Sequence, residues 1–164
     1  MLEIRLAVSA RDFVAARHLL RAYAADLPDH QGSEAALGDV ERLPGPYLPP
    51  QGSFYLALLD GDPVGCVALS RFDAETAEVK RMFVHTRARQ LGVGRALLSR
   101  LQQDARAAGY RRLRLGTIEE MAPAQRLYRA MGFVQIPDYR PSITTVDTLF
   151  FECDLSAIPR EEKP

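Results

Sequence analysis

The chain has 164 residues, a length typical of a single domain with its own hydrophobic core. Lysine plus arginine number 21, and aspartate plus glutamate also number 21, so the formal net charge is zero. This balance argues against a general nucleic-acid binder, whose affinity depends on a basic surface. No uninterrupted apolar run approaches the roughly 20 residues that a membrane-spanning helix needs, and the N-terminal residues lack the pattern of a secretory signal.

The cysteines and histidines show no pattern of a disulfide framework or a metal site. Cys66 and Cys153 are too few for such a framework, and each lies in an apolar run where we expect it to be buried. A reducing cytoplasm is therefore the expected compartment. His18 and His30 have no metal-ligand spacing with each other or with a cysteine, so no metal is predicted. His85 follows a predicted strand and could reach a cleft, but a solvated loop histidine is the simpler interpretation.

The pattern of apolar and polar residues predicts elements in the order β-α-α-β-β-β-α-β-α-β-β. Ser9 followed by Asp12 predicts an N-cap and an acidic capping box for the first helix. Short turns at 61–63 and 73–75 join three strands into an antiparallel meander, and the strand–helix–strand order that follows predicts a crossover. The predicted strands are Leu2–Val8, Ser53–Asp60, Val64–Phe72, Thr76–Val84, Arg112–Thr117, Phe133–Ile136 and Val146–Leu155, and the predicted helices are Ala10–Leu27, Ser33–Leu43, Gly92–Ala108 and Met121–Met131.

The balanced charge is unevenly distributed along a chain that no linker divides. Residues 85–114, the basic segment, contain eight arginines and one acid, whereas residues 26–62, the acidic segment, contain seven acids and one arginine. The basic segment could bind a polyanionic ligand and the acidic segment a cationic one, although both could equally be solvated faces. Residues 1–155 are expected to form one domain, and residues 156–164 a disordered tail.

A glycine motif, Arg89-Gln90-Leu91-Gly92-Val93-Gly94, lies between the fourth predicted strand and the third predicted helix. Its two glycines allow a tight turn that brings backbone amides close to a ligand, and the N-terminus of the next helix favours an anion such as pyrophosphate. The motif differs from a Rossmann fingerprint because Leu97 stands where the third glycine would be. It differs from a P-loop because no Gly-Lys-Ser/Thr follows.

Three blocks, in order, resemble the GNAT superfamily of N-acetyltransferases. Arg89-x-x-Gly92-x-Gly94 resembles its Arg/Gln-x-x-Gly-x-Gly/Ala signature, Ala77–Val84 its central strand, and Ala124-x-x-Leu127-Tyr128-x-x-x-Gly132-Phe133 its second helix. The resemblance covers roughly Phe54–Asp154. It implies an α/β (α+β) fold, in which a mixed, mostly antiparallel, twisted sheet of about seven strands is flanked by about four helices. It also implies that acetyl-CoA lies in a V-shaped cleft.

The resemblance further implies which backbone groups bind acetyl-CoA. The central strand would offer main-chain groups to the pantetheine, and the glycine loop would surround the pyrophosphate with amides. The residues concerned are Met82, Phe83 and Val84 in the strand, and Arg89, Gln90, Gly92, Val93, Gly94 and Arg95 in the loop. The basic segment would assist with the cofactor's phosphates. The acidic segment would lie where the family binds its acceptor, which suits a cationic amine.

Acetyl transfer to an amine requires the ammonium ion to lose a proton and the leaving thiolate to gain one. By the resemblance, Glu78 is the candidate base, directly or through water, and its alternative role is an ion pair with Lys80. Tyr128 matches the family's proton donor to the CoA sulfur, and its alternative role is apolar packing. Met121 stands where relatives often carry asparagine. Arg140 could bind a substrate carboxylate as a bidentate fork, or be an exposed loop residue.

The sequence therefore predicts an N-acetyltransferase that uses acetyl-CoA and acetylates the primary amine of a small molecule by direct attack in a ternary complex. Two alternatives stay open. One is a non-catalytic acetyl-CoA-binding sensor or interaction module, against which the presence of Glu78 and Tyr128 argues. The other is a peptide or protein-lysine acetyltransferase, which the zero net charge makes the weaker interpretation. Homodimers are common in the family, but no residue here indicates one.

Overall fold

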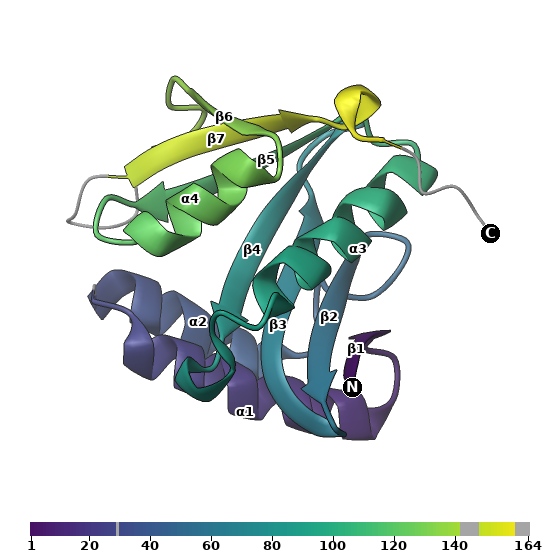
Figure 1. Cartoon of the computed structure of the whole chain (residues 1–164), viewed down its shortest axis with the longest axis vertical. Coiled ribbons are helices and arrows are strands. Elements are labelled where there is room, and N and C mark those ends of the chain that lie inside the picture. The colour runs from purple at the N-terminus through teal and green to yellow at the C-terminus, as the bar shows by residue number, and fades with distance from the viewer. Residues whose placement is uncertain (29, 142–147, 160–164) are drawn as a thin grey trace.

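The computed structural model describes residues 1–28, 30–141 and 148–159. One mixed sheet contains seven strands in the order β1-β2-β3-β4-β5-β7-β6, and four helices flank it (Figure 1). This arrangement confirms the predicted fold class. The strands are β1 (Leu2–Leu6), β2 (Gly52–Leu59), β3 (Asp62–Arg71), β4 (Thr76–Val84), β5 (Arg112–Ile118), β6 (Phe133–Ile136) and β7 (Thr148–Asp154). The helices are α1 (Ala10–Asp26), α2 (His30–Arg42), α3 (Val93–Ala107) and α4 (Ala122–Ala130).

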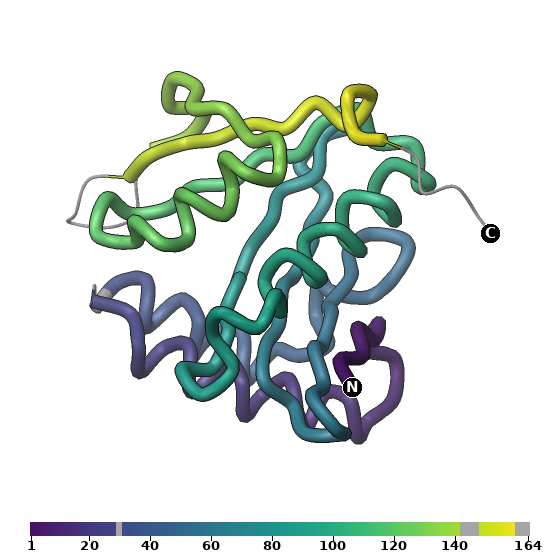
Figure 2. The backbone as a smooth tube through the Cα atoms, in the orientation of Figure 1, coloured from purple at the N-terminus to yellow at the C-terminus, as the bar shows by residue number. Residues whose placement is uncertain are grey.

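The sheet separates two hydrophobic cores. Helices α1 and α2 cover one face, and α3 and α4 cover the other (Figures 1 and 2). Side chains of a strand alternate between its faces, so Phe54 packs in the α1–α2 core whereas its neighbour Tyr55 packs in the α3–α4 core. None of the helices in the described residues is long and apolar enough to cross a membrane.

Strands β4 and β5 are neighbours for only part of their length. Their parallel ladder runs from Thr76, opposite Arg112, to Glu78, opposite Arg114. Beyond Glu78, β4 stays paired with β3 and β5 stays paired with β7, so the two strands diverge (Figure 2). The edge of β4 that faces β5 is therefore without a strand partner, among the described residues, from Val79 onward.

A β-bulge bends β4 within this diverging part. Lys80 lies opposite Ala68 and Phe83 lies opposite Cys66, so Arg81 and Met82 together face one residue of β3. Arg81 has a φ of 56°, a value that costs free energy for a residue with a side chain. Its side chain offsets that cost, because Arg81 Nε donates to Asp39 Oδ2 of α2 at 2.7 Å.

Local signals locate most element ends, with small shifts. The predicted capping box is present, since Asp12 N donates to Ser9 Oγ at 3.1 Å and Ser9 N donates to Asp12 Oδ2 at 3.2 Å. Helix α2 begins at His30, earlier than the predicted Ser33. The residues expected to begin the last strand, 146 and 147, lie outside the described residues.

Of the tail that the sequence predicted to be disordered, the structure describes residues 156–159. Leu155–Ala157 form a short 3-10 turn, and the Asp154 carboxylate accepts from Ser156 N at its start. The Arg106 guanidinium donates to the Ile158 carbonyl. These contacts hold the segment against α3, and residues 160–164 lie outside the described residues.

Candidate active site

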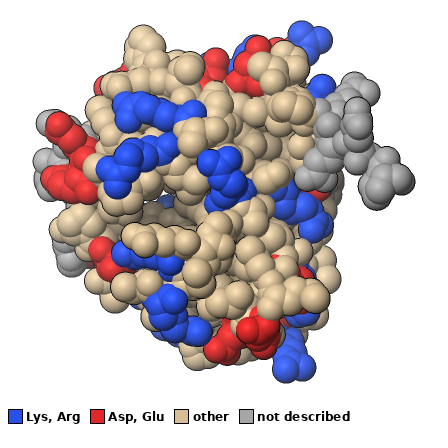
Figure 3. All heavy atoms as spheres, in the orientation of Figure 1, with Lys and Arg blue, Asp and Glu red and all other residues tan. Residues whose placement is uncertain are grey.

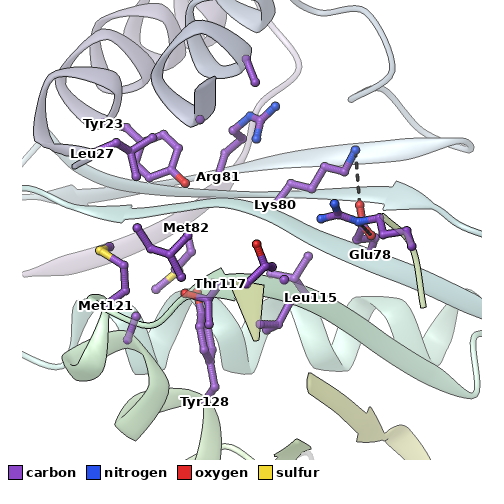
Figure 4. Close-up of a pocket in the computed structure, with 18 residues that line it drawn as sticks. Tyr23, Leu27, Glu78, Lys80, Arg81, Met82, Leu115, Thr117, Met121 and Tyr128 are labelled. Atoms are coloured by element: carbon purple, nitrogen blue, oxygen red, sulfur yellow. Dashed lines mark hydrogen bonds and ion pairs between the residues drawn. The ribbon is translucent and has the colours of Figure 1, made fainter. Parts of the chain in front are cut away.

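A cavity of about 370 Å³ lies where β4 and β5 diverge (Figure 4). Its lining comes from α1, α2, β4, β5 and α4, so it reaches from one face of the sheet to the other. Met82, Met121 and Tyr128 form an apolar part toward α4, whereas Glu78 and Lys80 form a charged part on the opposite side of β4 (Figure 4). The apolar part suits an acyl chain, and the charged part suits a polar acceptor.

The glycine loop forms the N-terminus of α3. Gly92 is the N-cap, with a φ of 78° and open space around the position of a Cβ. A Cβ on Gly94 would lie 2.8 Å from Leu127 Cδ2 and 3.0 Å from Met82 Cε, so this glycine allows α3 to pack closely on α4 and β4. The first amides of α3 have no intrahelical acceptor, and the helix dipole adds a partial positive charge. This cradle has the shape and charge to accept a pyrophosphate.

Two ion pairs join the basic segment to the acidic segment. Arg89 Nη2 lies 2.8 Å from Asp26 Oδ2, and Arg87 Nη1 lies 3.3 Å from Asp62 Oδ2. Of the eight arginines in the basic segment, Arg95 alone has neither an ion pair nor a hydrogen bond among the described residues. Figure 3 shows lysine and arginine side chains on both sides of the hollow between α4 and the α1–α2 pair.

The acidic segment does not form the expected acceptor site. It contributes Leu27, Gly32 and Ala35 to the cavity lining, and none of its described acidic side chains. Its buried acid, Asp39, instead accepts from Arg81 Nε at 2.7 Å and from the Tyr47 hydroxyl at 2.7 Å. A preference for cationic amines therefore cannot be based on this segment.

Glu78 lines the cavity and is also held in a network of donors. Lys80 Nζ lies 3.4 Å from Glu78 Oε1, which is the ion pair given as the alternative role. On Oε2, the Tyr139 hydroxyl donates at 2.7 Å and Arg140 Nε donates at 3.3 Å. Burial, followed by the neighbouring Glu78 carboxylate, raises the pKa of Tyr139, so its hydroxyl remains a donor. The sequence placed the Tyr139 region near the acceptor pocket but gave no sign of its contact with Glu78, because nothing local links Tyr139 to β4.

Tyr128 shows the packing that was its alternative role, and its hydroxyl also reaches the cavity. Its ring packs 5.8 Å from the ring of Phe133 and 6.4 Å from that of Phe151, while its hydroxyl points into the cavity (Figure 4). Burial, and to a smaller extent Tyr23, raises the pKa of the Tyr128 phenol, which therefore stays protonated at neutral pH. The hydroxyl of Tyr23 also projects into the cavity, although sequence periodicity placed this residue only on a helix.

His85 and the two cysteines lie outside the cavity. His85 does not line the cavity, and its buried Nδ1 has no hydrogen-bond partner among the described residues. The described histidine, cysteine and acidic residues include no group of three or more that could hold a metal ion. Cys66 and Cys153 are free and buried, as predicted.

Comparisons with known proteins agree on one family. Residues 15–133 match the profile described as "Acetyltransferase (GNAT) family". The chain is 40% identical over 105 residues to IAA acetyltransferase of Azospirillum brasilense, and this match covers 63% of this chain and 68% of that protein. It is 36% identical over 124 residues to N-acetylaspartate synthetase of Danio rerio. This match covers 71% of this chain but only 43% of that longer protein.

A solved structure agrees with the sequence comparisons. A GNAT family acetyltransferase from Elizabethkingia anophelis, with acetyl-CoA bound, has the same fold with a TM-score of 0.64 at 19% identity. The match covers 93% of this chain and 97% of that one. The residues that the family profile matches include β4 and α4, which line the cavity, and the glycine loop at the start of α3. The chain belongs to the GNAT family of acetyltransferases.

Proposed function

We propose that the protein is an acetyl-CoA-dependent N-acetyltransferase that acetylates the primary amine of a small molecule. The observation that carries the proposal is the cavity, where the unpaired edge of β4 meets a buried tyrosine hydroxyl, and whose lining residue Met82 lies against Gly94 of the glycine loop. Family membership supports it, as does the acetyl-CoA bound to a protein of the same fold.

The backbone of β4 and the first turn of α3 would hold the cofactor. Met82, Phe83 and Val84 would offer main-chain groups to the pantetheine, because this part of β4 has no strand on its β5 side. Phe83 contributes only backbone, since its side chain is buried in the α1–α2 core. The pyrophosphate would lie on the loop residues Gln90, Gly92, Val93, Gly94 and Arg95.

Arg89 has a supporting part in this loop. Its amide donates to the Thr86 carbonyl at 3.3 Å, and its Nε donates to the Val84 carbonyl at 3.0 Å. Its Nη2 is paired with Asp26 at the end of α1. Arg89 therefore holds the loop between β4 and α1 while other amides remain for the phosphates.

Acetyl-CoA supplies the acetyl group as a thioester. An N–C bond forms as the C–S bond breaks. The ammonium group loses two protons in all: the base passes the first to solvent before the attack, and the second balances the proton that the thiol gains. Tyr128 is the proposed donor to the sulfur, a role for which its raised pKa keeps it protonated. Glu78 is the proposed base, directly or through water, and Tyr139, Lys80 and Arg140 hold its carboxylate in place.

Calorimetric titration with acetyl-CoA tests the cofactor site. The wild-type protein should bind, and Gly92→Glu should not, because its side chain would carry a negative charge into the pyrophosphate cradle. Gly109→Glu is the matched control, since Gly109 also has a positive φ and open space but lies at the other end of α3. Equal binding by all three proteins, or by none, would refute the assigned site.

Release of CoA with a panel of amines then tests turnover. Small amines should be acetylated, and Glu78→Gln should lower kcat/KM by about 10²- to 10⁴-fold if Glu78 is the base. Acetyl-CoA binding without turnover of any amine would favour the non-catalytic module. Turnover confined to lysine-containing peptides would favour the peptide acetyltransferase.

A further inference from the structure

The charged part of the cavity carries more positive than negative charge. Lys80, Arg81 and Arg140 line it, and Glu78 is the only carboxylate among the described lining residues. Arg81 is already paired with Asp39 behind the cavity wall. Lys80 and Arg140 thus share the single carboxylate of Glu78, and the charged part has an excess of one cation.

Arg140 is held in a defined position rather than exposed on a loop. Its Nε donates to Glu78 Oε2 at 3.3 Å, and its guanidinium carbon lies 5.5 Å from the ring centroid of Phe150. A third of its side chain is accessible, at 33%. The contact with Glu78 uses Nε alone, whereas a guanidinium has four further N–H donors on its two Nη atoms.

Gly116 of β5 provides the space for this guanidinium. A Cβ on Gly116 would lie 3.0 Å from Arg140 Nη2 and 3.2 Å from Phe150 Cε1. Any larger residue at 116 would push Arg140 away from its place beside Glu78. Three neighbours together fix the direction of the two Nη atoms of Arg140. They are Gly116, the ring of Phe150 and the Glu78 carboxylate at Nε.

On this basis, and resting on the proposed N-acetyltransferase function, we propose that the acetyl acceptor is an amino acid whose carboxylate binds Arg140 and Lys80. A guanidinium binds a carboxylate through two parallel hydrogen bonds, and the nearby ammonium group of Lys80 adds a second positive charge. An amine without a carboxylate would enter a cavity of net positive charge and leave these donors unpaired. The site therefore selects an amine that carries its own negative charge.

Paired acceptors test this inference. CoA release is measured with each common L-amino acid and with its primary carboxamide, which keeps the amine and the side chain but lacks the α-carboxylate. The best amino acid should exceed its amide by about 10- to 100-fold in kcat/KM, the loss expected for one charge-assisted contact. Arg140→Met should remove most of this preference by raising KM for the amino acid, while acetyl-CoA binding stays unchanged. Arg11→Met is the matched control. Arg11 is an exposed arginine at the start of α1, whereas Tyr23 near the end of this helix lines the cavity, so this variant should keep the preference for the amino acid over its amide.

Gly116→Ala is the second variant, and it should weaken the preference in the same direction by displacing Arg140. Calorimetric binding of the same amino acid and amide, with acetyl-CoA absent, reports the carboxylate site without turnover. Equal kcat/KM for acid and amide, equal binding of the two, or an unchanged preference in Arg140→Met would each overturn the inference. In contrast, a carboxylate preference in binding without any CoA release would overturn the enzymatic function but keep the carboxylate site.

Discussion

The contact between Asp39 of α2 and Arg81 at the bulge of β4 makes a sharp prediction about stability. Asp39 is buried, with 6% of its side chain exposed, and it accepts from Arg81 Nε and the Tyr47 hydroxyl, each at 2.7 Å. Asp39→Asn keeps the shape of the side chain but removes its charge. Arg81, with 19% of its side chain exposed, then becomes a largely buried cation beside a strained backbone.

Removing one partner of a buried ion pair typically costs about 3–5 kcal/mol. Because asparagine keeps one acceptor oxygen, we expect the lower end, about 3 kcal/mol, a large share of the roughly 5–15 kcal/mol that stabilises a typical domain. For a chain of this size this corresponds to a fall in Tm of about 6–12 °C. Thermal unfolding followed by circular dichroism at pH 7 measures it. A fall of less than about 2 °C would refute the argument that this pair holds the bulge.

Two controls separate the ion pair from general damage. Arg42 also contacts Asp39, but 65% of its side chain is exposed, so Arg42→Met should cost no more than about 1 kcal/mol. Adding Arg81→Met to Asp39→Asn removes the unpaired cation, and the double variant should be more stable than Asp39→Asn alone. A double variant with a lower Tm than the single one would contradict the proposed cause.

The stabilisation by Asp39 has a defined pH dependence. Burial raises the pKa of Asp39, but the Tyr47 hydrogen bond and the Arg81 charge together bring it below the ordinary value of 3.8. A carboxyl whose pKa is lower in the folded protein stabilises it fully above the unfolded pKa, and this stabilisation is lost as the pH falls through the folded pKa. The difference in Tm between wild type and Asp39→Asn should therefore be constant above about pH 5 and shrink below pH 4.

Three further predictions concern other parts of the molecule. Tyr128→Phe should lower kcat by about 10²- to 10⁴-fold and leave the calorimetric affinity for acetyl-CoA within a few fold, whereas unchanged kcat would exclude Tyr128 as the proton donor. Burial raises the pKa of Cys153 to about 11 and that of Cys66 further, so a thiol reagent at pH 8 should modify neither until denaturant unfolds the chain. Ser9→Ala removes the acceptor for Asp12 N and should lower the free energy of unfolding by about 1 kcal/mol in a urea titration, with Ser99→Ala inside α3 as the control.

Local chemistry explains what the sequence predicted well. Ser9 and Asp12 act on amides within one helical turn, so their spacing alone identifies the start of α1. Gly92 ends a loop where a left-handed φ is needed, and such positions favour glycine whatever surrounds them. The continuous apolar runs in β2 and β3 indicate strands that are buried on both faces of the sheet.

The interactions that complete the site could not be predicted in this way, because they join segments far apart in the chain. Tyr139 and Arg140 reach Glu78 across 61 and 62 residues, and no local pattern encodes that approach. Arg89 and Asp26, 63 residues apart, form an ion pair between two segments whose charges suggested separate ligands. Charge counted along a sequence indicates a binding face only where the fold leaves those charges unpaired.

The end of the β4–β5 ladder at Glu78 explains why one short region combines these features. Glu78 is the last residue of β4 with a partner on β5, so its neighbours toward Val84 turn unpaired backbone groups to the cavity. An unpaired strand edge exposes donors and acceptors that an amide-containing ligand can pair with, as an added strand would. The bulge at Arg81 then redirects this edge, and its strain is offset by Asp39 on the helix that borders the acceptor side. The proposed cofactor edge of β4 and helix α2 are therefore connected through one ion pair, and Asp39→Asn should weaken acetyl-CoA binding as well as lower Tm.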